Sequence, residues 1–231
     1  MLTASRFIAA MTIVIALVVS PRLTVAGGII VHGTASGAAA RTTTGTLESI
    51  PEVVLPDEGG HVEQEAGSSI VLPDVMSIGT ATVSTTGTIG SAAATTRSVA
   101  ALEDVNLLNG LITAKRVVAV SRSEGDGRTA HSSSVGSALI GLVIDGVSFG
   151  AVTPAENTRI DLPGIGAVVL NEQTQQGNGW RTSALTVNMI RLIIDGTRGG
   201  DVVVGSVHSG VTLPAPRTAA ELAPARATHR D

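Results

Sequence analysis

The chain contains no cysteine among its 231 residues. This absence excludes a disulfide framework and any zinc site built on thiolates. It does not exclude export, because a domain of this length can be stable without cross-links. The length fits one domain of ordinary size, or one domain with tails.

Aromatic residues are nearly absent: there is no tyrosine, and the aromatic side chains are Phe7, Phe149 and Trp180. This scarcity argues against stacking platforms for nucleic-acid bases or sugars. Hydrophobic residues still make up 43% of the chain. The core must therefore be built from Val, Ile, Leu and Ala, each contributing roughly 1.5–3 kcal/mol when fully buried.

Charged residues are scarce too, at 15% of the chain, compared with about 25% in typical soluble domains. The net charge is −4, and Lys115 is the only lysine. No cluster of basic residues occurs, so we expect no nucleic-acid partner.

The N-terminal stretch has the layout of a secretory signal peptide. Arg6 precedes the apolar run Phe7–Ser20, and small residues follow near Val25 and Ala26. This pattern predicts a helical signal peptide over residues 1–26, cleaved after Ala26. A membrane anchor is the alternative, but a spanning helix needs about 20 apolar residues, and Pro21 ends this run too soon. We therefore expect a secreted or extracellular protein with no transmembrane span after cleavage.

Short β-rich runs, closed by glycine or by Asp-Gly pairs, follow the signal. The clearest are Lys115–Arg122, Leu139–Ile144, Ala184–Ile194 and Asp201–Thr212. The pairs Asp126-Gly127, Asp145-Gly146 and Asp195-Gly196 predict turns. This spacing indicates an all-β fold, an antiparallel β-sandwich that is jelly-roll-like or a meander. A β-solenoid is the alternative, although the chain has no fixed short repeat.

Three finer expectations follow from the pattern. Alternation in Asp201–Thr212 places Val203, Val207 and Val211 on one face. Leu102–Leu111 is the best helical candidate, weakened by its Asn-Gly pair. The domain should span residues 27–213, and the Pro- and Ala-rich residues 214–231 should form a disordered tail.

The stretch NTRIDLPGIGAVVLNEQ contains a Pro-Gly pair between two aliphatic runs. Pro163 and Gly164 suit the second and third positions of a type II turn, because proline fixes φ near −65° and glycine tolerates a positive φ. The stretch ends on Asn171, Glu172 and Gln173, which form either a polar binding patch or an ordinary strand end. We favour the strand end.

Five ordered segments together resemble the bacterial choice-of-anchor P family. They are Ile50–Gly60, Val105–Val117, Asn157–Gln173, Leu185–Leu192 and Asp201–Val211. The resemblance implies an exported protein of the bacterial cell envelope with no assigned enzymatic activity. The chain departs from the family after Pro214, where it has no apolar span and no sortase-type pentapeptide.

The sequence offers little support for catalysis or metal binding. The histidines do not show the i, i+4 spacing of a helical zinc pair, and no phosphate-binding loop occurs. The carboxylate pairs Glu124/Asp126 and Asp195/Asp201 are too few for a calcium loop, so we interpret both as turns. We expect no catalytic residue, no metal and no cofactor.

These observations predict a non-catalytic structural or binding module of the envelope or the extracellular space, whose partner the sequence does not identify. One alternative is a small-ligand or glycan-binding protein, with Asn171, Glu172, Gln173 and Trp180 as weak candidate binding residues. A second alternative is a secreted hydrolase, in which His131 or His208 would meet a carboxylate and a serine.

Overall fold

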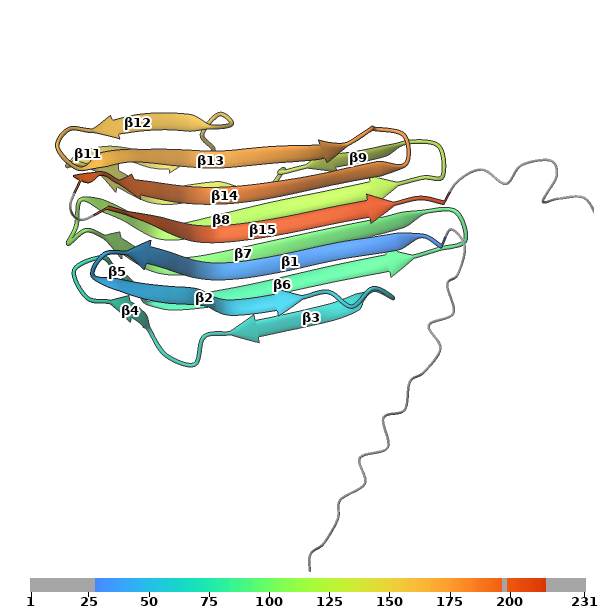
Figure 1. The fold of residues 1–231 in the computed structure, drawn as a ribbon, viewed down its shortest axis with the longest axis horizontal. Helices are drawn as coiled ribbons and strands as arrows, with labels where there is room; N and C mark the ends of the chain where they lie inside the picture. Colours follow the sequence, from blue (N-terminus) through green and yellow to red (C-terminus); the bar gives the residue numbers. More distant parts are fainter. Residues whose placement is uncertain (1–27, 197–198, 215–231) are drawn as a thin grey trace, which may run out of the picture.

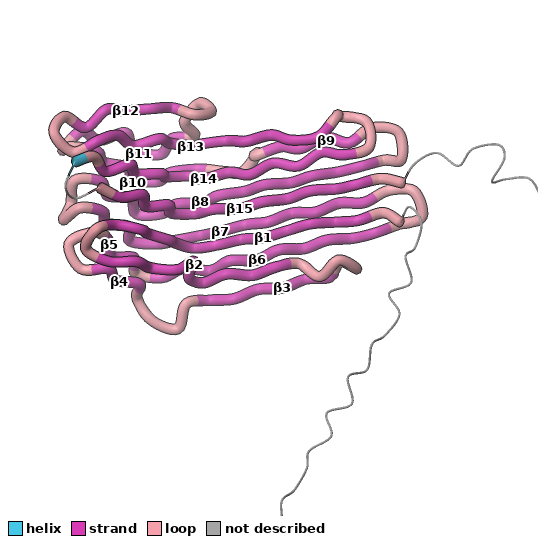
Figure 2. The backbone as a smooth tube through the Cα atoms, viewed as in Figure 1, coloured by secondary structure: helices cyan, strands magenta, loops and turns pink. Residues whose placement is uncertain are grey.

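The computed structural model describes residues 28–196 and 199–214. Within this part the chain forms two antiparallel sheets that face each other (Figure 1), and most of it is strand (Figure 2). The predicted antiparallel β-sandwich is confirmed. The β-solenoid alternative is wrong, because neighbouring strands pair antiparallel within two stacked sheets. The strands are β1 (Ile30–Thr42), β2 (Gly45–Val54), β3 (Gly60–Glu65), β4 (Ile70–Leu72), β5 (Met76–Ile78), β6 (Thr80–Ile89), β7 (Ala94–Leu107), β8 (Ile112–Gly125), β9 (Ala130–Ser133), β10 (Ala138–Ile144), β11 (Val147–Val152), β12 (Thr158–Leu162), β13 (Gly166–Gly177), β14 (Thr182–Ile194) and β15 (Gly200–Thr212).

The first sheet, here sheet A, has the strand order β12-β13-β14-β15-β1-β2. It is a meander of the last four strands, to which β1 and β2 are added beside β15. The second sheet, sheet B, runs β11-β10-β8-β7-β5-β4, with β6 beside β7, β3 beside β6 and β9 beside β8. The predicted strands of the sequence correspond to β8, β10, β14 and β15.

Both ends of the described domain lie at the same end of the sandwich. Ile30 of β1 pairs with Thr212 of β15, so the two strands start and finish together (Figure 1). The longest strands, β7 and β8, have 14 residues each, which corresponds to about 45 Å. We call the end with Ile30 and Thr212 the terminal end, and the opposite end, with the β12–β13 turn, the distal end.

Large aliphatic side chains fill the interior toward the distal end. They come from both sheets and are at most 3% exposed; examples are Ile78, Val105, Leu107, Ile112, Leu142, Ile144, Ile190, Leu192 and Val204. A smaller apolar cluster of Val31, Leu55, Ala94, Ala130 and Val211 closes the terminal end. The core is therefore aliphatic, as the aromatic-poor composition predicts.

Between these two apolar regions the interior is lined with hydroxyl groups. We call this set the hydroxyl belt: Thr85, Thr96, Ser98, Ser121, Ser123, Ser132, Ser183 and Ser209. Hydroxyls of sheet B donate to backbone carbonyls of sheet A, from Ser98 to His208 O at 2.7 Å and from Ser121 to Leu185 O at 2.8 Å. A single short side chain thus spans the gap between the sheets, so the sheets lie close together here.

One transverse row of irregular positions crosses the strands of sheet A. From β13 to β2, each pair of neighbouring strands has one position, at the same height in the sheet, where the facing residues are not paired in the β-ladder. The row, which we call the transverse row, consists of Asn171, Met189, Gly205, Gly37 and Pro51. Asn171 and Gly205 have positive φ angles of 51° and 70°. Sheet B has a matching break at Asp104, Lys115 and Gly141, two of which also have positive φ.

The transverse row changes which residues of a strand face the core. In β15, Val202 and Val204 are buried on the distal side, whereas Val207 and Val211 are buried on the terminal side. The prediction that Val203 shares a face with Val207 and Val211 is therefore wrong for Val203. The positive φ of Gly205 shifts the alternation by one residue.

The helical candidate Leu102–Leu111 is also wrong. Residues up to Leu107 continue β7, and the chain then turns through Leu108, Asn109 and Gly110, all at positive φ. Asn106 Oδ1 accepts a hydrogen bond from Gly110 N at 2.7 Å and stabilises this turn. Propensity was a weak guide here because the segment buries its alternate side chains in the sandwich.

The Asp-Gly turns are where the sequence predicts them. Asp145 and Gly146, with φ of 50° and 74°, join β10 to β11. Asp126 N donates to Thr129 O at 3.1 Å in the β8–β9 hairpin, and Gly196 follows β14 with a φ of 74°.

The predicted signal peptide, residues 1–26, lies outside the described residues, as does the predicted tail beyond Pro214. Within the described part, no helix is long and apolar enough to cross a membrane.

Candidate functional site

Asn171 is the residue of β13 that lies in the transverse row. It is 3% exposed and has a left-handed backbone, a conformation that asparagine tolerates better than most residues. Its Nδ2 donates to Pro154 O at 2.9 Å, and its Oδ1 accepts from Gln173 Nε2 at 3.0 Å. The side chain is thus turned into the protein and holds the segment that precedes β12.

Glu172 points to the outer face of sheet A, where it joins three strands. Its Oε2 accepts from Asn188 Nδ2 at 2.7 Å, and its Oε1 accepts from Arg191 Nη1 at 2.8 Å. Arg191 also donates to Asp201 Oδ2, from Nη2 at 2.6 Å and from Nε at 3.0 Å. The hydrogen bonds to Asp201, and then those to Glu172, raise the pKa of Arg191. The network joins β13, β14 and β15 where the backbone ladders skip a level.

Gln173 is bonded on both its backbone and its side chain. Its N–H donates to Asn157 Oδ1 at 2.9 Å, and its Nε2 donates to Ser134 Oγ at 2.9 Å. The three polar residues at the end of NTRIDLPGIGAVVLNEQ therefore connect β13 to its neighbours, and they lie in the middle of β13, not at a strand end.

Trp180 stands apart from this trio. Gly177, at the end of β13, lies six positions beyond Asn171 along the extended strand, which is about 20 Å. Trp180 lies in the loop beyond, with 68% of its surface exposed. Asn178 Oδ1 accepts hydrogen bonds from the backbone N–H groups of Trp180, Arg181 and Thr182 at 2.9, 2.9 and 3.2 Å. This loop presents the indole from a fixed backbone, but not to the polar trio.

Pro163 and Gly164 form the predicted turn. Gly164 has a φ of 75°, and Ile165 N donates to Leu162 O at 3.0 Å. The prediction of a type II turn is confirmed in the feature that requires glycine, the positive φ at the third position.

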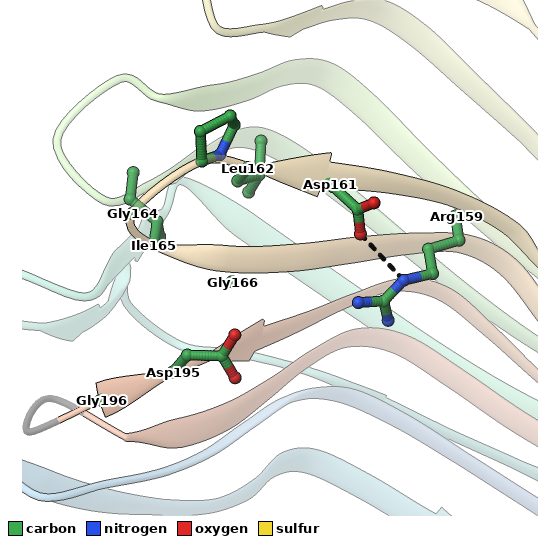
Figure 3. A pocket seen from close by; sticks show the side chains of 9 residues that line it. Arg159, Asp161, Leu162, Gly164, Ile165, Gly166, Asp195 and Gly196 are labelled. Carbon is green, nitrogen blue, oxygen red and sulfur yellow. Dashed lines mark hydrogen bonds and ion pairs between the residues drawn. The ribbon is translucent and has the colours of Figure 1, made fainter.

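The turn borders an open hollow of about 430 Å³ at the distal end (Figure 3). Arg159 Nε donates to Asp161 Oδ1 at 3.0 Å on one side, and the carboxylate of Asp195 faces the hollow from the end of β14. The Arg159 and Asp161 side chains are 55% and 77% exposed. Charged groups this exposed to water contribute little binding energy. The hollow therefore presents charged side chains to a ligand, but it would remove little water from them or from the ligand.

Three of the four carboxylates considered for calcium have other partners. Asp201 binds Arg191, and Glu124 Oε1 lies 2.6 Å from Arg122 Nε. Asp126 Oδ1 accepts from the backbone N–H groups of Thr129 and Arg128, which lower its pKa. In residues 28–196 and 199–214 no three His, Asp or Glu side chains converge as metal ligands.

The two histidines considered for a hydrolase lie on different sheets. His131 Nε2 is 4.0 Å from Glu124 Oε1 on sheet B. His208 Nδ1 lies 3.0 Å from Thr186 Oγ1 on the outer face of sheet A. The buried serines near His208, including Ser209, face the interior instead, because alternate residues of a strand point to opposite faces.

The hydroxyl belt is a feature that motif searching misses. Its hydroxyls bond to one another: Ser209 Oγ lies 2.7 Å from Ser121 Oγ and 2.8 Å from Ser123 Oγ, and Ser132 links Ser123 to Ser183. The sequence signal that could have revealed the belt is the alternation of inward-facing residues in β8, because Ser121 and Ser123 continue the inward positions of Val117 and Ala119. The hydroxyls are satisfied internally, so the belt is a packing device.

The geometry defines an antiparallel β-sandwich with a hydroxyl-lined interior and outer faces tied by cross-strand polar contacts. The chain belongs to the family described as "Domain of unknown function (DUF8256)", which matches residues 30–159. No curated protein and no solved structure matches the chain. The match ends inside β12, although β1 pairs with β15 along its whole length. The folded unit therefore extends beyond the matched residues. The resemblance to the choice-of-anchor P family stays a prediction.

Proposed function

We propose that the protein is an exported, non-catalytic structural module of the bacterial cell envelope or the extracellular space. One observation carries this proposal: the polar residues that the sequence offers as a site hold the strands together. Asn171 lies in the transverse row, and the Glu172–Arg191 ion pair spans it. Their positions support a role in maintaining the sheet.

The arrangement of the chain ends supports the same proposal. Both ends of the described domain leave from the terminal end, so strands of about 45 Å extend away from any point of attachment. The signal-like N-terminal sequence and the resemblance to an envelope family add support for export. A module of this shape can act as a spacer or as one unit of an assembly.

A pair of matched variants tests the structural role of the polar trio. Glu172→Gln removes the negative charge of the carboxylate that accepts hydrogen bonds from Asn188 and Arg191. We expect this substitution to lower the free energy of unfolding by about 1–2 kcal/mol. Glu103→Gln is the control, because the Glu103–Arg116 pair is 3.3 Å long with side chains 43% and 49% exposed. We expect the control to stay within about 0.5 kcal/mol of the parent.

The same proteins test the absence of catalysis. The parent should show no turnover above background on chromogenic ester, glycoside, peptide and phosphate substrates. Turnover that disappears in His208→Gln or Asp195→Asn would contradict the proposal and favour the hydrolase. A ligand whose affinity falls in Glu172→Gln, at an unchanged unfolding midpoint, would instead make the trio a binding site.

A glycan- or ligand-binding role is the second candidate, and Trp180 is the observation that favours it. Its indole is exposed on a loop that Asn178 fixes from three backbone groups. Trp180 is also the only tryptophan of the chain, so its fluorescence reports directly on this loop. Titration with soluble peptidoglycan fragments and oligosaccharides tests the role. A saturable change that Trp180→Ala abolishes in a direct binding assay, and that Phe149→Ala preserves, would support it.

A further inference from the structure

Two histidines lie on neighbouring strands of the outer face of sheet A. His32 of β1 pairs with Gly210 of β15, and His208 precedes Gly210 by two residues, so the two imidazoles are diagonal neighbours. On this side of the transverse row the buried residues are Val31 in β1 and Val207 in β15. His32 and His208 occupy the alternate positions, so both side chains point outward.

The ring of His208 is held in a defined orientation. Its Nδ1 lies 3.0 Å from Thr186 Oγ1, a residue directly opposite on β14. Its Nε2 lies 3.6 Å from the point that a Cβ of residue 210 would occupy, and the Cβ of His32 lies 3.7 Å from the same point. The Nε2 of His208 is therefore above Gly210, beside His32. The absence of a side chain at Gly210 leaves this space open.

The surroundings favour the form of imidazole that binds metals. A ring nitrogen coordinates a metal only when its proton is absent. The Nδ1 of His208 is hydrogen-bonded to Thr186, so its Nε2 is the ring nitrogen that lies near Gly210 and His32. The hydrogen bond to Thr186 leaves the outer nitrogen free to coordinate, which is how a second-shell partner orients a metal-binding histidine.

We propose that His32 and His208 form a two-histidine site for a divalent transition-metal ion on the outer face of sheet A. His208 Nε2 and a ring nitrogen of His32 provide two ligands, and water completes the coordination. Imidazole suits zinc, copper and nickel, whereas calcium and magnesium prefer oxygen ligands. The affinity should rise from Mn²⁺ through Ni²⁺ to Cu²⁺ and fall again at Zn²⁺, following the general order for nitrogen sites.

Calorimetric titration of the full, tag-free chain with CuCl₂, NiCl₂, ZnCl₂ and CaCl₂ tests the site. We expect one transition-metal site and no binding of calcium. His32→Asn and His208→Asn should each weaken binding by about tenfold or more, and Thr186→Val should weaken it by about tenfold through loss of the orienting bond. His61→Asn is the matched control, because His61 is also hydrogen-bonded to a threonine, Thr86, but lies on sheet B. It should leave the affinity unchanged.

Electron paramagnetic resonance of the Cu²⁺ complex gives an independent result. Two coordinated imidazole nitrogens in the parent and one in His32→Asn would support the site. One nitrogen in the parent, unchanged affinity in the two histidine variants, or an equal loss in His61→Asn would overturn it. His32 is exposed, so His32→Asn decides the question even if His208→Asn fails to fold.

Discussion

Gly205 is the position where a single methyl group should reveal how the two sheets fit together. Its backbone has a φ of 70° in the middle of β15. A Cβ there would lie 3.2 Å from Val117 Cγ1 and 3.5 Å from both Ala119 Cβ and Leu102 Cδ1. These atoms belong to buried side chains of sheet B. Gly205→Ala should therefore destabilise the fold in two ways. An alanine in a left-handed conformation costs about 1–2 kcal/mol, and the overpacked contact with sheet B costs about 1–3 kcal/mol.

We expect Gly205→Ala to lower the free energy of unfolding by about 2–5 kcal/mol. Gly164→Ala separates the two contributions. Gly164 has a similar φ of 75°, but no atom lies within 4 Å of its would-be Cβ. It should therefore show the conformational contribution alone, about 1–2 kcal/mol. Urea denaturation of the parent and both variants measures the difference, provided that the slope with denaturant is unchanged.

The comparison has a clear negative outcome. If Gly205→Ala destabilises the protein no more than Gly164→Ala, sheet B does not pack closely beneath Gly205. If neither variant is destabilised, the backbone is not left-handed at these positions, and the explanation of the changed alternation in β15 fails.

Four further predictions concern other parts of the chain. Gly164→Val should lower the free energy of unfolding by about 1 kcal/mol or more, because a β-branched residue is strained at positive φ; an unchanged urea midpoint would refute the turn. The pKa of His208 lies below its ordinary value of 6.5 in the folded state, so the unfolded chain binds the proton more readily. Stability should therefore fall as the pH drops through about 6.5, and the thermal midpoint of His208→Gln should depend less on pH between about 7 and 5; equal slopes would refute this. Truncation after Leu213 should leave the thermal midpoint and the partition between cells and medium unchanged, because Leu213 itself is buried and its N–H donates to Arg181 O at 2.7 Å; a drop of several degrees would show that the tail packs on the domain. N-terminal sequencing of exported protein should begin at Gly27, and an intact membrane-bound precursor would contradict the predicted cleavage.

Local signals made the strands and turns predictable. The aliphatic runs around Val117 and Leu142 required burial, and the Asp-Gly pairs supplied residues that tolerate the positive φ of tight turns. The Pro163-Gly164 turn followed from the same chemistry. The pairing of β1 with β15 was not predictable, because about 180 residues separate Ile30 from Thr212 and no local rule relates the two segments.

The changes of face within strands were harder to foresee. A strand pattern assumes that side chains alternate without interruption, and this assumption placed Val203 on the wrong face. The interruption at Asp104 likewise hid the continuity of β7 and made Leu102–Leu111 resemble a helix. Aspartate and asparagine tolerate left-handed conformations but do not require them, so their identity alone does not predict the break.

The candidate site also shows that local sequence alone does not define the role of a polar residue. Asn171, Glu172 and Gln173 are residue types that bind ligands as readily as they bind neighbouring strands. The sequence predicts Glu172 at a strand end, whereas it lies in the middle of β13, and its partners Asn188 and Arg191 lie 16 and 19 residues away in the chain. The distinction between a binding site and a structural tie depends on those distant partners.

The transverse row explains why one sheet carries such different chemistry along its length. On the distal side of the row, Ile190 and Leu192 face inward while Arg191 faces outward. On the terminal side the alternation is reversed, so Val187 and Ser209 face inward while Thr186 and His208 face outward. One missed alternation therefore gives the domain an aliphatic interior with an ion-paired outer face at one end. At the other end it gives a hydroxyl-lined interior with an outer face of threonine and histidine. The polar trio lies at this boundary, where Asn171 is skipped in the β13–β14 ladder and the Glu172–Arg191 ion pair connects the two strands.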